Sequence, residues 1–421
     1  MAMDALARAL RSKNVSLRLE KPFNKSSYQR EDPMRRTSSI VSALVVASGS
    51  TAYFSDIKPS VAQDAACAFP TAASSTMEET AWRLFVAANC PGNGTQVVWE
   101  NWIEQSSLYP AGAAQAVAAN QAPPRLHGSP LARAEMIRTQ GLQAALAPSS
   151  ECNKMGGPPP NVKPGATICE EARLNPEAEA FVRAQKFQAR PGQTSAAEHG
   201  EDIEFPTPAI EVKVDWIPAS DFSPPFTCSD PPSGVRVETV EGQCYAMAGM
   251  HISSKLLPRW LWATFEPQSM LTNPLRCITF GPCNDHWGSS PASSEGGPGG
   301  FTQQTPELKS LMQRAKLAPP FFNYRLDGVQ ADFTNPMYLG NSVIEGENVG
   351  MTKNTASCIT CHSVSSIENN GTDGITVLAK MNPPVGPQYM PPAGWIARDF
   401  VWSLGLACPV PAGTFGLQTC R

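Results

Sequence analysis

The sequence predicts an α+β fold, with a disulfide-stapled mixed upstream domain followed by a small, mostly α module. Three observations favour it. Helical and strand-like apolar patterns both occur across residues 63–338. Of the 12 cysteines, ten lie outside the one CxxC pair, an even number that suggests disulfides. A processed chain of about 360 residues also exceeds what one compact core usually serves, so we expect two regions.

Residues 1–62 have the features of an export signal. Arg35-Arg36 precedes the apolar run 40–47, and Ser60-Val61-Ala62 offers small residues for a signal peptidase. The polar stretch before Arg35 is unusual, and a true start at Met34 would give the signal an ordinary length. We therefore expect a periplasmic or secreted protein. No other segment approaches the ~18 continuous apolar residues needed to cross a bilayer, so we expect no transmembrane segment in the mature chain.

The charge of the processed chain argues against a nucleic-acid partner. Without residues 1–62, 23 Lys and Arg face 32 Asp and Glu, a formal charge of −9. Such acidity disfavours binding to phosphate backbones.

The ten remaining cysteines are expected to form structural bridges between neighbours, although sequence alone does not fix connectivity. Short loops rich in proline and glycine gain order from such bridges. The expected pairs are Cys67 with Cys90, Cys152 with Cys169, Cys228 with Cys244, Cys277 with Cys283, and Cys408 with Cys420.

The upstream domain, residues 63–338, opens with helix signals and continues with strand signals. Helices are expected after the capping pattern Thr76 to Glu79, from Ser129-Pro130 towards Leu146, and from Asn175-Pro176 towards Phe187. Alternation of apolar residues then predicts a strand at 210–214, a hairpin whose strands flank Glu241-Gly242, and a strand at 260–265. Residues 284–304 have no apolar pattern and are expected to form a Gly/Ser-rich loop.

The motif Cys358-Ile359-Thr360-Cys361-His362 is the most specific feature of the chain. Its spacing predicts covalent attachment of one haem c through two thioether bonds, with His362 as an iron ligand. A zinc site would need a second CxxC or a paired His cluster, which the sequence lacks. A redox-active dithiol would need a thioredoxin-like βαβ context, which is not visible here.

The surrounding segments give the motif a family resemblance. A short helix over 339–348, the motif, a turn at 369–371, Met390-Pro391-Pro392 and a helix over 395–406 follow each other in this order. This order resembles a class I cytochrome c and defines residues 339–421 as a cytochrome c-like haem module. The resemblance implies that Met390 is the sixth iron ligand. Met381 is a minor candidate, and a ligand from the upstream domain is the main rival.

Four further histidines are present: His127, His199, His251 and His286. Each is expected to be a surface or hydrogen-bonded residue. His251 is the most interesting, because it ends a predicted strand close to Trp260 and Trp262 and could line a pocket beside the iron.

As a whole, the chain resembles large, secreted, single-haem cytochrome c family proteins of Gram-negative bacteria, which implies haem binding and single-electron transfer. The expected partner is a redox protein or a small-molecule electron donor or acceptor. The alternative is a haem-dependent oxidoreductase, peroxidase-like or oxidising a small molecule, with an open or labile sixth iron site and His251 as acid or base. A haem-bearing binding protein is a third possibility. The large upstream domain argues against a mere carrier, whereas the lack of a recognisable acid–base constellation argues against an enzyme.

Overall fold

The computed structural model describes part of the chain. The described residues are 65–94, 96–109, 126, 152–155, 159, 161–269, 271–277, 283–291, 301–334, 336–347, 351, 355–378, 380–381 and 384–407. All of them belong to one folded unit, residues 60–421. The expected export signal, the helix from Ser129 to Leu146, His127 and the pair Cys408 with Cys420 lie outside the described residues, and the boundary at 338/339 stays a prediction.

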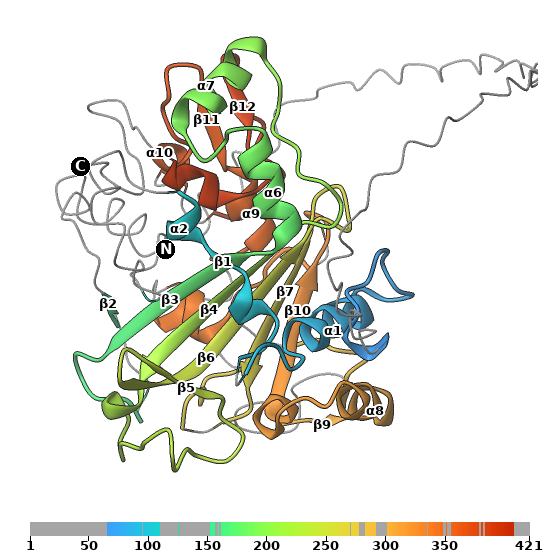
Figure 1. Ribbon diagram of the computed structural model, residues 1–421, viewed down its shortest axis with the longest axis vertical. Coiled ribbons are helices and arrows are strands. Elements are labelled where there is room, and N and C mark those ends of the chain that lie inside the picture. Colours follow the sequence, from blue (N-terminus) through green and yellow to red (C-terminus); the bar gives the residue numbers. More distant parts are fainter. Residues whose placement is uncertain are drawn as a thin grey trace, which may run out of the picture. The chain divides into compact units, whose positions relative to one another are not determined.

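An eight-stranded antiparallel sheet organises this unit (Figure 1). Its main path is β1 (Ile103–Glu104), β3 (Thr167–Leu174), β4 (Ile210–Pro218), β6 (Gln243–Ser254), β7 (Leu261–Pro267) and β10 (Tyr324–Gln330). β2 (Asn153–Lys154) pairs with β3, and β5 (Val237–Val240) pairs with β6. The turn between β5 and β6 is the expected hairpin at Glu241-Gly242, where both residues have positive φ angles of 51° and 81°. This is the conformation that a two-residue hairpin of type I′ needs.

The first face of the sheet carries the main apolar core. Helix α1 (Met77–Ala88) begins as predicted, because Oγ1 of Thr76 accepts a hydrogen bond from the backbone N–H of Glu79 at 3.1 Å. The helix packs against β6, β7 and β10, with Phe85 4.5 Å from Phe265 between ring centroids. Helix α8 (Pro306–Arg314) lies against α1 and continues this layer (Figure 1).

The second face of the sheet is polar and is covered by the C-terminal part of the chain. Side chains alternate between the faces of a strand, so Glu211, Lys213 and Asp215 project away from the core that receives Val212 and Val214. The π-helical turn η6 (Ser342–Glu347) packs on β6 over this face. It begins at Ser342, later than the helix predicted from residue 339, because Oδ1 of the preceding Asn341 accepts hydrogen bonds from the free N–H groups of Val343 and Ile344.

Short elements complete the C-terminal part. They are α9 (Cys358–Ser363), β11 (Ser366–Glu368), α10 (Ile375–Leu378), β12 (Trp395–Ala397) and η7 (Trp402–Leu406). The predicted helix over 395–406 is wrong: its start pairs as β12 with β11, and Asp399 and Phe400 have positive φ angles of 49° and 68° that interrupt any helix. Helices α6 (Pro176–Ala184) and α7 (Arg190–His199) lie nearby, with α7 packed against β11 and β12 (Figure 1). A mixed α/β structure with few helices is therefore present.

Several short elements connect these layers: η1 (Ala65–Cys67), η2 (Trp99–Asn101), α2 (Gln105–Leu108), η4 (Ala219–Asp221), β8 (Ser289–Ser290), β9 (Gln303–Gln304) and η5 (Pro319–Asn323). Four of the five predicted disulfides are confirmed: Cys67–Cys90, Cys152–Cys169, Cys228–Cys244 and Cys277–Cys283. In the described part of the chain, no helix has both the length and the apolar character required to traverse a bilayer.

Candidate functional site

Helix α9 carries the predicted attachment residues. Ser357 caps it by accepting a hydrogen bond from the Thr360 N–H. Cys358 and Cys361, one turn apart, are the only cysteines among the described residues outside disulfides. Burial raises the pKa of both thiols, that of Cys361 to about 12. Both sulfurs are therefore protonated thiols at neutral pH.

A buried glutamine of the sheet fixes the position of α9. Gln330, at the end of β10, is fully buried. Its Oε1 accepts a hydrogen bond from the Ile359 N–H at 3.1 Å, and its Nε2 donates to Ser357 Oγ at 3.1 Å. The first turn of a helix has free N–H groups, so an amide side chain there satisfies one of them and anchors the helix.

His362, at the other end of α9, is held in one ring orientation. Its Nδ1 lies 2.8 Å from the carbonyl oxygen of Phe400. Because a carbonyl only accepts, Nδ1 carries the proton and donates. The ring also packs against Trp262 of β7, with centroids 4.3 Å apart. Burial lowers the pKa of His362 to about 3. The imidazole is therefore neutral at pH 7, and its Nε2 keeps a lone pair for a metal.

A small void of about 40 Å³ adjoins His362, enough for a few water molecules. Glu211 and Lys213 of the sheet line one side of it. Leu378 of α10 and Trp402 of η7 line the other. The side chain of Trp402 is only 8% exposed, and its indole Nε1 is buried without a hydrogen-bond partner. The void thus combines one apolar wall with one charged wall.

The charged wall contains a carboxyl group that titrates near neutrality. Burial raises the pKa of Glu211 to about 7, against the opposing charge of Lys213 and a hydrogen bond from Ser403 Oγ at 3.3 Å. Lys213 forms an ion pair of 2.8 Å with Glu170. Burial would lower the pKa of Lys213, but the charges of Glu170, Asp215 and Glu345 and the hydrogen bond to Glu170 together outweigh it and raise this pKa, so the ammonium stays charged.

The structure places Met390 near α9 but does not turn its side chain inwards. The Tyr389 N–H donates to Ser363 Oγ at 3.1 Å, which ties this loop to α9. The side chain of Met390 is 73% exposed. Met381 is partly buried against the apolar cluster that includes Ile359 and Cys361. A ligand role for Met390 stays a prediction, and it requires the loop to turn this side chain inwards.

His251 lies on the polar face but not in the wall of the void. Its Nε2 is 3.4 Å from a carboxylate oxygen of Glu345 in η6. Burial would raise the pKa of Glu345, but His251, the charge of Lys213 and the hydrogen bond from the Asn341 N–H together outweigh it, so this pKa is lowered. His199 lies at an exposed helix end with its Nδ1 2.7 Å from Ser195 O, His286 is exposed as well, and neither lines the void beside His362.

The sequence interpretation missed the residues that position His362. Trp262 was expected to neighbour His251, and Gln330, Glu211 and Lys213 were not singled out. For Glu211 and Lys213, the sequence signal is the alternation of apolar and charged residues from 210 to 215. Its charged residues face the same side of the sheet as His251 on the neighbouring strand. That alternation resembled a solvent-facing surface.

Comparison of this chain with protein-family models, curated proteins and solved structures finds no match. A functional assignment therefore depends on the chemistry of the residues themselves.

Proposed function

We propose that this protein is a periplasmic or secreted c-type cytochrome that transfers single electrons through one covalent haem c. Cys358 and Cys361 would hold the porphyrin through thioether bonds, and His362 would ligate the iron. The observation that carries the proposal is the state of His362: a neutral imidazole oriented by the Phe400 carbonyl, on the same short helix as two unpaired thiols.

The donor set fits this cofactor. A thioether forms when a thiol S–H adds across a vinyl group, and both cysteines are protonated thiols. Iron binding needs a neutral imidazole with its second nitrogen fixed by a hydrogen bond, which describes His362. The void beside His362 holds only a few waters, so a porphyrin requires Leu378 or Trp402 to move outwards.

When bound, the haem iron supplies the one-electron redox couple. The chain's own residues would then control its surroundings. Trp262 keeps the His362 ring from rotating, and the apolar side chains Leu378 and Trp402 limit access of water. A methionine thioether from Met390 in the sixth position would raise the potential. The redox partner would be a protein or a small-molecule donor or acceptor.

One observation favours a haem-dependent oxidoreductase as the second candidate. Glu211 shares the void with His362, and its pKa of about 7 suits a group that donates or accepts a proton at neutral pH. The exposed side chain of Met390 also leaves the sixth position without a ligand from that residue.

Optical spectra of the protein exported from a host that attaches haem c test the proposal. The carrier predicts low-spin iron with the methionine-to-iron charge-transfer band, slow cyanide binding, and loss of the band in Met390→Ala. Met337→Ala is the matched control, because Met337 is another exposed methionine, at 46%. High-spin iron that binds cyanide rapidly would instead support the haem-dependent oxidoreductase. In that case, the catalytic turnover of the enzyme should be lower in Glu211→Gln.

Covalent attachment has its own test. Acid extraction of the denatured protein should leave the colour with the polypeptide, and the mass should exceed that of the bare chain by one haem. The double variant Cys358→Ala/Cys361→Ala should lose both the colour and the added mass. A colourless wild-type polypeptide with the bare mass would exclude haem c.

A further inference from the structure

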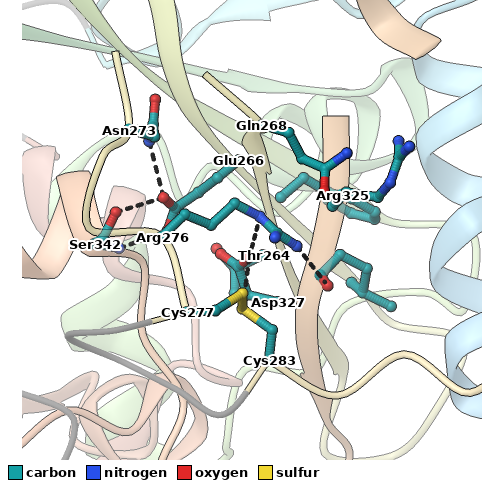
Figure 2. A network of polar contacts seen from close by, with 12 residues as sticks. Thr264, Glu266, Gln268, Asn273, Arg276, Cys277, Cys283, Arg325, Asp327 and Ser342 are labelled. Atoms are coloured by element: carbon teal, nitrogen blue, oxygen red, sulfur yellow. Dashed lines mark hydrogen bonds and ion pairs between the residues drawn. A yellow bond between two sulfur atoms is a disulfide. The ribbon is translucent and has the colours of Figure 1, made fainter. Parts of the chain in front are cut away.

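The disulfide Cys277–Cys283 lies in a buried polar network that the proposed haem site does not use (Figure 2). Oδ1 of Asp327, on β10, is 3.2 Å from Sγ of Cys283. The guanidinium of Arg276, next to Cys277 in the chain, is 3.1 Å from the same oxygen. Cys283 is 4% exposed, whereas Cys277 is partly exposed. One residue of the bridge is thus partly exposed, and the sulfur of the other lies against a carboxyl group.

This bridge has the weakest structural role of the four. Its sequence separation is 6, against 16, 17 and 23 for the others. A bridge stabilises a fold mainly by constraining the unfolded chain, and the constraint is smallest for the shortest loop. A stabilising role therefore gives little reason for surrounding this bridge with buried charges.

The carboxyl group beside Cys283 is in an unusual state. Asp327 is 5% exposed, and its Oδ2 has no hydrogen-bond partner. Burial raises the pKa of Asp327 well above its usual value, the neighbouring carboxylate of Glu266 raises it further, and Arg276 only partly opposes this. Burial and the charge of Glu266 therefore favour the protonated form of Asp327.

Glu266 is the second buried carboxyl group of this network. Its carboxylate accepts hydrogen bonds from the Ser342 N–H at 2.6 Å, from the Ser342 hydroxyl, and from Asn273 Nδ2 at 2.8 Å (Figure 2). Ser342 and Asn273 thus hold the Glu266 carboxylate in place beside Asp327, whose pKa it raises.

We propose that Cys277–Cys283 is a redox-active disulfide that exchanges with an external dithiol, with Asp327 as the proton donor to the sulfur of Cys283. A thiolate of the dithiol attacks Sγ of Cys277, the more exposed of the two residues, and forms a mixed disulfide as the Cys277–Cys283 bond breaks. The departing Cys283 sulfur takes the proton of Asp327. The second thiol of the dithiol then closes its own disulfide and gives its proton to Cys277, which leaves as a thiol. Asp327 regains a proton from solvent, into which the attacking thiol released its own, so the net transfer is two electrons and two protons from the dithiol to the pair.

A cation site made of the same side chains is a weaker interpretation. The ligand atoms of Cys277, Cys283 and Asp327 lie within 4.8 Å of one another. With the two sulfurs joined, however, they offer no thiolate, and the positive charge of Arg276 beside the carboxyl group disfavours a cation there.

The order of reduction tests the proposal. The folded protein is treated with limiting dithiothreitol at pH 7, and peptide mass spectrometry after alkylation at successive times identifies which cysteines open. Cys228 and Cys244 are both partly exposed, so access alone predicts that their bridge opens first. The proposal predicts that Cys277–Cys283 opens first. Opening of this bridge only in urea would overturn the proposal.

Two further measurements isolate Asp327 and the attacked sulfur. Asp327→Asn should slow opening of Cys277–Cys283 by about tenfold or more, since a positioned proton donor contributes at least this much. The exposed control Asp230→Asn, two residues from Cys228, should change neither bridge. Equal rates within about twofold for Asp327→Asn would overturn the donor role. In the wild-type protein, a monothiol such as 2-mercaptoethanol should be trapped on Cys277, and its appearance on Cys283 would contradict the assignment without any variant.

Discussion

Replacing Gln330 by methionine should destabilise the end of β10 and helix α9. Methionine has a similar length and volume, so the main change is the loss of the amide. In the folded protein the Ile359 N–H then has no acceptor inside a fully buried site. Ser357 Oγ keeps a partner, because it also lies 3.1 Å from Thr360 Oγ1.

The magnitude follows from these groups. A buried donor without a partner costs about 1–3 kcal/mol, and the lost bond to Ser357 adds about 1 kcal/mol. The amide also donates to the carbonyl oxygens of Pro336 and Met337, but the exposed position of Met337 lets water replace the amide there. We therefore expect the free energy of unfolding to fall by about 2–4 kcal/mol.

Urea unfolding measures this change, and hydrogen exchange locates it. Backbone amides of α9 should lose protection in Gln330→Met, whereas those of α1 on the other face of the sheet should follow only the global change. Gln313→Met on the exposed side of α8 is the matched control and should stay within about 0.5 kcal/mol of the wild type. A loss below about 1 kcal/mol for Gln330→Met, or no added exchange in α9, would refute the anchoring role.

Three further changes have predicted outcomes. Gly249→Ala places a Cβ 2.8 Å from Asn341 Oδ1 and should lower the free energy of unfolding, measured in urea, by about 1–3 kcal/mol. An unchanged value would show that Asn341 and the adjoining η6 move aside at no cost. The raised pKa of Glu211 means that its neutral form stabilises the fold below about pH 4.5 and that this contribution is lost as pH rises through about 7. Glu211→Gln should therefore gain up to about 3 kcal/mol relative to the wild type between pH 4.5 and 8, and parallel pH curves would contradict the assigned pKa. Alanine at both Cys67 and Cys90 should lower the unfolding free energy by about 3 kcal/mol, because their bridge spans 23 positions; an unchanged midpoint in thermal unfolding would show that the bridge contributes nothing.

Local signals in the sequence predicted local structure well. Thr76 and Asn175 cap helices as expected, since the capping side chain contacts an N–H only two or three residues away. Glu241-Gly242 forms the expected turn for the same reason. The four described disulfides join neighbours along the chain, where loop closure is easiest. A similar signal, Thr305-Pro306 before α8, was missed although it has the same chemistry as Asn175-Pro176.

The segment over 395–406 shows where local patterns fail. Ile396, Phe400 and Leu404 recur at helical spacing and are all buried, yet they share no helix: Ile396 lies in β12, Phe400 in a turn, and Leu404 in the short 3-10 helix η7. Pairing of β12 with β11 and the turn at Phe400 bury the same side chains and also present the Phe400 carbonyl to His362. A long-range pairing thus overrides the periodicity, which single-segment patterns do not encode.

The sequence by itself determined where the chain turns at Glu241-Gly242, which predicted helices are capped and where the CxxCH motif stands, because each depends on residues close together in the chain. Only the tertiary structure decided which face of β4 is covered. That choice places Glu211 and Lys213 beside His362, sets the pKa of each group and leaves Met390 exposed. The physical reason is that desolvation and electrostatic interactions depend on neighbours that are distant in sequence and adjacent only after folding.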